Sequence, residues 1–144
     1  NSSDENLVIV EEDEEEAYQK ISDEFGVEPV KIMNGPQNKN FERMEYDNQI
    51  QTAELIYRIN ERKFIYVINA SYKNTSWGID IEDQIVGQYK KNIEGCEIKI
   101  KEYEVKENKY RFSAQFSYMG LEYFLIGEME KMQFEEILES LYFL

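Results

Sequence analysis

The stretch "YRFSAQFSY", residues 110–118, most constrains the fold, because apolar and polar side chains alternate along it without a break. A period of two is that of a β-strand with one face against a core and the other in water. The stretch "AELIYRI", residues 53–59, has the same period. The apolar residues that these stretches place on one face are Ala53, Leu55, Tyr57, Ile59, Tyr110, Phe112, Ala114, Phe116 and Tyr118.

Two further stretches, residues 63–72 and 121–127, carry apolar side chains at both odd and even positions ("KFIYVINASY" and "LEYFLIG"). In a strand these two sets, here called the two parities, point to opposite faces. That pattern is typical of central strands that are covered on both faces. Turn-forming residues separate all these stretches at a spacing that suits consecutive antiparallel hairpins. These turn signals are Asn34, Gly35 and Pro36; Asp47 and Asn48; Asn60 and Glu61; Glu94 and Gly95; Asn108; Met119 and Gly120.

Helical spacing occurs near both ends of the chain. Ala17, Ile21 and Phe25 recur at intervals of four and form one apolar stripe, and Gly26 is expected to end that helix. The closing run, residues 130–144, returns to helical spacing and predicts a second helix that covers the sheet. The apolar stripe of this second helix consists of Phe134, Ile137, Leu138 and Leu141.

These patterns together predict an α+β fold. We expect a curved, mostly antiparallel meander sheet, with an N-terminal helix and a C-terminal helix packed on it. Residues 1–10 are expected to be an N-terminal arm or linker, and residues 11–144 to form a single α+β domain.

Two segments are harder to assign. In "CEIKIKEYEV" the apolar parity slips after Ile100, and a β-bulge near Lys101 and Glu102 would return Tyr103 to the earlier face. Residues 81–89 fit either a helix or a strand, and we favour a strand from about Gln84.

The charge of the chain restricts its partners. The formal net charge is -14, and residues 1–30 hold eleven acids against one base, a balance of 1 - 11 = -10. Nucleic acids and anionic membrane surfaces are bound mainly through Lys and Arg side chains. We therefore expect neither as a partner, and any link to a membrane would need an anchor outside these residues.

The inventory of reactive side chains points away from catalysis. The chain has no histidine, and Cys96 is its single cysteine. These counts exclude an intrachain disulfide and a thiolate metal site built from this chain alone, and they remove the commonest general base. We expect no enzymatic activity, no metal and no cofactor, and we expect Cys96 to be a buried structural thiol.

The stretch "SYKNTSWGID", residues 71–80, holds the single tryptophan, Trp77. Trp77 with Tyr72 and Asp80 forms a candidate ligand-binding set, since an exposed aromatic ring beside carboxylates suits sugar binding. With Glu82 and Asp83 nearby, a carbohydrate-active hydrolase is a further alternative, and a weak calcium site is another. The simpler interpretation is a turn in which Trp77 plugs the end of the sheet.

A dense set of aromatic residues allows two interpretations. Aromatic side chains are favoured in strands and dominate cores, so the first is a sheet core. The second is an apolar sheet cleft that holds a lipid or another apolar ligand. The set consists of Tyr57, Phe64, Tyr66, Tyr72, Tyr110, Phe112, Phe116, Tyr118, Tyr123 and Phe124.

The segments "NTSWGIDIEDQ" and "YFLIGEMEKMQFEEILESLYFL" resemble the bacterial domain-of-unknown-function family 4367, over roughly residues 25–144. The resemblance implies the C-terminal, outward-facing domain of a protein with a single membrane-spanning helix. No catalytic residue set is established for that family, so the resemblance implies a location rather than a reaction.

From this resemblance we expect an extracytoplasmic sensor or protein-interaction domain of a membrane-anchored bacterial protein, without catalytic activity. The first residue is Asn1 rather than Met, and we expect the anchor in a segment upstream of this chain. The expected partner is an unknown protein or a small apolar ligand. A carrier for a lipid or other apolar ligand in the aromatic sheet cleft is the alternative function.

Overall fold

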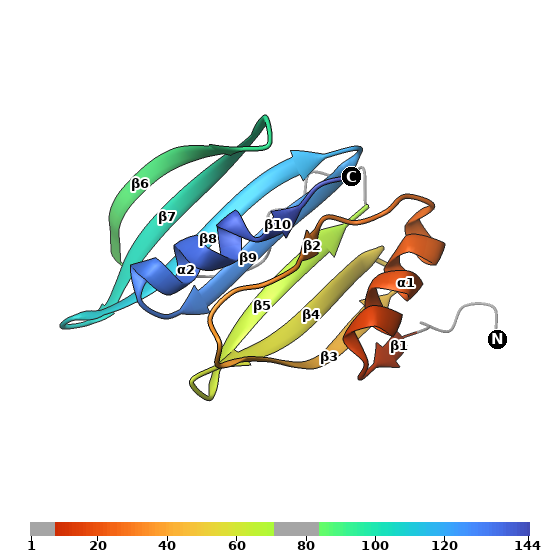
Figure 1. Ribbon diagram of the computed structural model, residues 1–144, viewed down its shortest axis with the longest axis horizontal. Coiled ribbons are helices and arrows are strands. Elements are labelled where there is room, and N and C mark those ends of the chain that lie inside the picture. The colour runs from red at the N-terminus through yellow and green to blue at the C-terminus, as the bar shows by residue number, and fades with distance from the viewer. Residues whose placement is uncertain (1–7, 71–83) are drawn as a thin grey trace.

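The computed structural model describes residues 8–70 and 84–144, which form a broad antiparallel sheet with two helices on one of its faces (Figure 1). Eight described strands build this sheet in the order β1-β3-β4-β5-β9-β8-β7-β6. Their bounds are β1 Val8–Glu11, β3 Lys39–Asp47, β4 Thr52–Ile59, β5 Arg62–Asn69, β6 Gln84–Ile93, β7 Cys96–Lys106, β8 Lys109–Tyr118 and β9 Leu121–Glu128. The expected α+β class is confirmed, as is the strand from Gln84.

The sheet consists of two meanders joined side by side. Strands β3, β4 and β5 follow one another, and so do β6 to β9, but β5 pairs with β9 rather than with β6. The next described strand after β5 is therefore at the far edge of the sheet, and the chain returns to the centre strand by strand. Strand β1, most of which falls in the expected N-terminal arm, pairs with β3 at the opposite edge.

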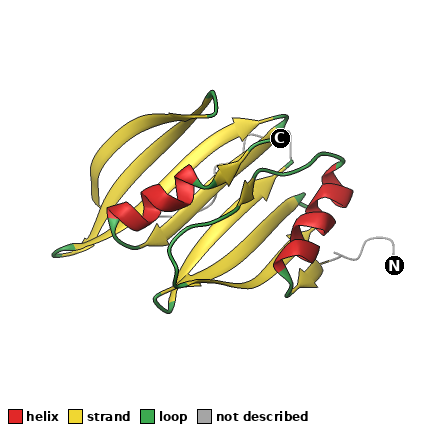
Figure 2. Ribbon diagram, viewed as in Figure 1, coloured by secondary structure: helices red, strands yellow, loops and turns green. Residues whose placement is uncertain are grey.

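Helix α1 (Glu14–Phe25), helix α2 (Lys131–Glu139) and the short strands β2 (Lys31–Ile32) and β10 (Leu141–Tyr142) lie on the same face, here called the covered face (Figure 2). Helix α1 packs against β1 and β3, and helix α2 against β8. Between them β2 pairs with β10, antiparallel. None of the helices in the described part of the chain is long and apolar enough to cross a membrane.

Helix α1 is capped at its start and ends where the sequence predicts. The Asp13 carboxylate accepts a hydrogen bond from the Glu16 amide at 2.9 Å, which satisfies one of the unpaired amides of the first turn. Gly26 takes the left-handed conformation (φ 73°) and its amide bonds the Ser22 carbonyl, which ends the helix. Ala17 and Ile21 of the predicted stripe are fully buried, and Phe25 packs at the core margin.

Helix α2 is shorter than its apolar stripe predicts. It stops at Glu139 with Ser140 as its C-cap, and Leu141 belongs to β10, where it pairs with Ile32. Leu141 is buried as predicted, but in an extended conformation. The pairing with β2, which lies more than a hundred residues earlier, overrides the local helical spacing.

The covered face carries the aromatic core. Tyr57, Phe64, Tyr66, Phe112 and Tyr123 are at most 1% exposed. Each such ring removes about 150–250 Å² of surface from water, so these residues dominate the burial energy of the fold. The expected interpretation of the aromatic residues as a sheet core holds for these five.

The opposite face is partly apolar at its centre. Val67 on β5 and Phe124 and Ile126 on β9 form a small buried cluster there, with Ile65 beside it. Both parities of β5 and β9 are thus buried, which confirms them as the central strands that the sequence predicts.

The predicted bulge at Lys101 and Glu102 is wrong. Both residues pair without interruption with β8, and Tyr103 therefore points to the face opposite Ile98 and Ile100. There the Tyr103 hydroxyl lies 3.2 Å from that of Ser113, and both side chains are buried. The Tyr103 ring therefore does not return to the covered face as predicted, and its hydroxyl makes a polar contact on the opposite face instead.

Three hairpins are closed by two-residue turns whose residues have positive φ. In the turn between β4 and β5 these residues are Asn60 (φ 51°) and Glu61 (φ 65°). Such turns match the twist of the strands, but the left-handed conformation is strained for a glutamate. Gly95 and Gly120 take the equivalent second positions in the other two turns.

Replacing Glu61 by glycine is therefore expected to stabilise the protein by about 0.5–1 kcal/mol, because it removes this strain. Glu61 is exposed, so no packing is lost. Urea unfolding measures the change. The matched control is Glu107→Gly, at an exposed turn position without positive φ, where glycine should destabilise. Equal effects of both substitutions would contradict the strain argument.

Candidate functional site

The candidate ligand-binding residues of the sequence, Trp77, Tyr72 and Asp80, lie outside the described residues. The same holds for Glu82 and Asp83. Within the described residues, two other groups have the burial or the chemistry of interest for function. One is a set of buried tyrosines under the helices, and the other is an opening between two hairpins.

The first group, here called the tyrosine cluster, consists of Tyr18, Tyr57, Tyr66 and Tyr123. Tyr18 comes from α1 and the other three from β4, β5 and β9. The Tyr18 and Tyr57 hydroxyls lie 3.1 Å apart, and the Tyr57 hydroxyl donates to the Glu14 carboxylate at 2.7 Å. The cluster thereby connects the start of α1 with the middle of the sheet.

The tyrosine cluster also holds the strap, residues 27–33, which follows α1 and includes β2. The Tyr66 hydroxyl donates to the Val30 carbonyl at 2.6 Å, and the Val30 amide donates to the Tyr123 hydroxyl at 2.9 Å. The Ile32 amide donates to the Tyr18 hydroxyl at 3.0 Å. Because the strap is buried at Val30 and Ile32, these side chains supply partners that water would otherwise provide.

Burial keeps these hydroxyl groups neutral. Desolvation raises the pKa of Tyr66 well above its ordinary value, and it does the same for Tyr18. Desolvation also raises the pKa of Tyr123, to about 12, although the bond from Val30 opposes that shift. The hydroxyls of Tyr18 and Tyr57 each serve as both donor and acceptor, and those of Tyr66 and Tyr123 each bond the strap. Neutral hydroxyls bonded in this way are structural groups, so the cluster stabilises the fold rather than performing chemistry.

Lys39 adds a charged group at the margin of the cluster. Its Nζ lies 5.0 Å from the centre of the Tyr57 ring, within range of a cation–π interaction. Partial burial lowers the pKa of Lys39, and the Glu14 carboxylate opposes that shift. Glu14 already accepts a hydrogen bond from the Tyr57 hydroxyl. Lys39, Tyr57 and Glu14 therefore interact with one another and link β3, β4 and α1.

The second group, here called the hairpin cleft, is an opening between the start of β7 and the end of β8. The ladder between these strands runs from Lys106 to Lys99 and stops at the Lys99 and Gln115 pair. Continued in register, it would also join residues 96–98 to residues 116–118. The β6–β7 hairpin stays paired as far as its turn, and so does the β8–β9 hairpin. The sheet therefore forks between these two hairpins.

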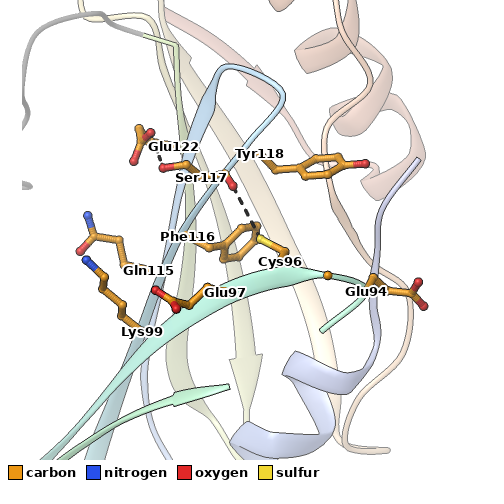
Figure 3. Close-up of a pocket in the computed structure, with 10 residues that line it drawn as sticks. Glu94, Cys96, Glu97, Lys99, Gln115, Phe116, Ser117, Tyr118 and Glu122 are labelled. Atoms are coloured by element: carbon orange, nitrogen blue, oxygen red, sulfur yellow. Dashed lines mark hydrogen bonds between the residues drawn. The ribbon is translucent and has the colours of Figure 1, made fainter. Parts of the chain in front are cut away.

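A cavity of about 440 Å³ lies in this fork. Cys96, Phe116 and Tyr118 line it from one parity of the strands, and Glu97 and Ser117 line it from the other. Side chains of both parities are expected around an opening between strands, whereas a groove on one face would show only one. Figure 3 shows these residues arranged around the fork.

Two hydrogen bonds define the polar groups of the hairpin cleft (Figure 3). The Cys96 thiol donates to the Ser117 carbonyl at 3.6 Å, and the Ser117 hydroxyl donates to Glu122 at 2.6 Å. A thiol is a weak donor, so the Ser117 carbonyl retains much of its capacity to accept a stronger one. The fork thus presents a main-chain acceptor beside a carboxylate.

Cys96 itself is buried, as the sequence predicts. Desolvation raises its pKa, so the thiol rather than the thiolate is the form present near neutral pH. In the described residues no three His, Cys, Asp or Glu side chains are grouped to hold a metal ion.

The hairpin cleft was not predicted from the sequence, although three of its residues, Glu94, Gly95 and Cys96, were named there for other reasons. Its residues come from three strands and one turn, and they meet only because β7 and β8 stop pairing. The one available signal was the position of the two turn signals, at Glu94 with Gly95 and at Met119 with Gly120. These place two neighbouring hairpin ends at one edge, but not the fork between them.

The comparisons with known proteins give one match. The family described as "Domain of unknown function (DUF4367)" matches residues 29–141, which is most of the chain. Neither the curated proteins nor the solved structures give a match to the sequence or to the fold.

The bond from Tyr66 to Val30 can be tested by Tyr66→Phe, which leaves the Val30 carbonyl buried without its partner. We expect a loss of about 1–3 kcal/mol in the free energy of unfolding, measured with urea. Tyr142→Phe is the matched control, because Tyr142 is 49% exposed, and should change stability little. Equal losses in the two variants would contradict the role assigned to the hydroxyl.

Raising the pH should weaken the fold through Tyr123. Its pKa in the folded protein is about 12, whereas an unfolded tyrosine titrates near pH 10. The unfolded chain therefore loses its proton first, and the stabilisation is complete below about pH 10 and falls as the pH rises towards 12. We expect Tyr123 to account for about 1 kcal/mol of the loss by about pH 11.

Urea unfolding of Tyr123→Phe and of the parent protein, from about pH 9 to about pH 11, measures this share. The decline should be shallower in Tyr123→Phe than in the parent, while Tyr142→Phe should follow the parent. Parallel curves for Tyr123→Phe and the parent would show that Tyr123 does not contribute.

Proposed function

The chain belongs to the family described as "Domain of unknown function (DUF4367)", and from this premise we propose that it is a non-catalytic sensor or protein-interaction domain. In this proposal the domain is bacterial and extracytoplasmic, and a membrane anchor outside these residues holds it at the cell surface. Its ligand is a protein partner that binds at the hairpin cleft.

The hairpin cleft is the observation that carries the proposal. It is open to a ligand and lined by carboxylates, a main-chain acceptor and an aromatic wall. By contrast, the buried tyrosines and Lys39 already bond one another, Glu14 or the strap. The bonds of the tyrosine cluster are largely buried and hold the fold. The bonds of the cleft are an exposed one between Ser117 and Glu122 and a weak one from Cys96, which a ligand can replace.

The charge of the chain supports a protein partner. A net charge of -14 opposes binding to nucleic acid or to an anionic lipid surface, since both repel carboxylates. The three glutamates of the hairpin cleft, Glu94, Glu97 and Glu122, share this sign. A basic region of a protein meets such a surface with complementary charge.

The alternative carrier function would need space among the aromatic rings of the covered face. Phe112 stacks on Phe134 of α2 at 5.4 Å, and Phe116 stacks on Tyr123 at 4.7 Å between ring centres. A lipid could enter only if α2 and the strap moved away from these rings. The packing therefore favours the interaction domain over the carrier.

The location can be tested on the intact gene product. We expect the reading frame upstream of these residues to encode one hydrophobic segment of about 20 residues, long enough to span a membrane. We also expect protease added to intact cells to cleave the domain. An upstream frame without such a segment, or a domain protected from protease, would overturn the proposed location.

The interaction can be tested by site-specific photo-cross-linking of the anchored protein in its own membrane. A benzophenone side chain in place of exposed Gln115, at the hairpin cleft, should give a discrete adduct. The same group in place of exposed Glu107, at the other end of β7, should not. Adducts from neither position, or equal adducts from both, would count against a partner at the cleft.

A further inference from the structure

We propose that the hairpin cleft recognises a lysine or arginine side chain on an extended segment of the partner protein. This inference rests on the proposed function and names the chemistry of the partner. It follows from three properties of the fork: its unpaired strand edges, its charge and its aromatic wall.

The first property is the end of the β7 and β8 ladder. Residues 96–98 and 116–118 would be paired if the register continued, but the ladder stops at Lys99 and Gln115. Main-chain groups at a strand edge need hydrogen-bond partners, and an extended peptide offers both amides and carbonyls. The Ser117 carbonyl is one such acceptor, and its partner among the described residues is the weak thiol donor of Cys96.

The second property is the sign of the charge. Glu94, Glu97 and Glu122 line the hairpin cleft, and Lys99 is the one base among its described lining residues. The Glu97 carboxylate lies 3.8 Å from the Lys90 ammonium group at the surface. Such an exposed ion pair contributes little free energy, so it does not prevent Glu97 from binding another cation. A guanidinium or ammonium group between Glu97 and Glu122 would donate to both carboxylates and to the Ser117 carbonyl.

The third property is a rigid aromatic wall. Phe116 is held by stacking on Tyr123, with the two ring planes only 9° apart. Tyr118 packs edge-on against Phe143 at 5.0 Å, and its hydroxyl donates to the Leu144 carbonyl at 2.7 Å. The aliphatic stem of a basic side chain packs on such a wall while its charged end reaches the carboxylates.

The volume of the cavity suits this occupant. A cavity of about 440 Å³ falls within the range of small-ligand sites, roughly 300–1,000 Å³, and is too small for a folded element. A free polyamine shares the chemistry of a basic side chain but lacks the peptide main chain. The experiment below separates these two sources.

Cys96 provides the readout, because it is the single cysteine of the chain and lines the hairpin cleft. Iodoacetamide labels the thiol slowly, since Cys96 is only 8% exposed and burial raises its pKa. A bound side chain would slow the labelling further. The probe is the blocked peptide acetyl-Thr-Val-Arg-Val-Thr-amide, with a matched peptide in which glutamine replaces the arginine.

We expect the arginine peptide to slow the labelling in a saturable way, and the glutamine peptide to bind at least about tenfold more weakly. The double variant Glu97→Gln and Glu122→Gln should weaken the arginine peptide by about tenfold as well. Glu107→Gln, an exposed glutamate outside the cleft, is the matched control and should leave the affinity unchanged. Urea unfolding of each variant confirms that it is folded.

The outcomes separate this inference from the proposed function. Equal protection by the two peptides, or protection by spermidine alone, would overturn the inference even if cross-linking at Gln115 succeeds. Protection that survives the double variant would also overturn it. If cross-linking fails but only the arginine peptide protects Cys96, the recognition chemistry stands and the native partner is the part that is wrong.

Discussion

The fold depends on the bonds that two tyrosine hydroxyls make to one buried residue of the strap. Val30 is buried against the sheet, and its amide and carbonyl are bonded by Tyr123 and Tyr66. An extended segment in an apolar layer is stable only if its main chain finds partners, because water is excluded there. The two tyrosines lie on β9 and β5, so the strap is held at the seam where the two meanders join.

This arrangement explains why the two ends of the sheet differ. Around the seam, stacked rings and hydroxyl bonds pack the layers closely, and β5 and β9 are buried at both parities. Further along, β7 and β8 separate, and the hairpins continue to their turns without each other. A rigid centre supports an open fork at the margin, which is the arrangement expected of a site held on stable elements.

Much of the fold could be predicted from local sequence, but the candidate site could not. The alternation in β4 and β8, the stripe and cap of α1 and the two central strands were predicted, because each depends on neighbouring residues. Tyr103 and Leu141 were misplaced, since the pairing of β7 with β8 and of β10 with β2 decides their conformation. The hairpin cleft was missed for the same reason, as no local pattern reports where a ladder stops.

The sequence by itself determined the class of structure and the chemistry available to it. Periodicity, turn residues and the absence of histidine are properties of the chain that folding does not change. Tertiary structure alone decided that β5 pairs with β9, that tyrosine hydroxyls hold the strap and that Cys96 lies in a fork beside Ser117. These contacts join residues far apart in the chain, and their energies depend on how the whole core packs rather than on any local preference.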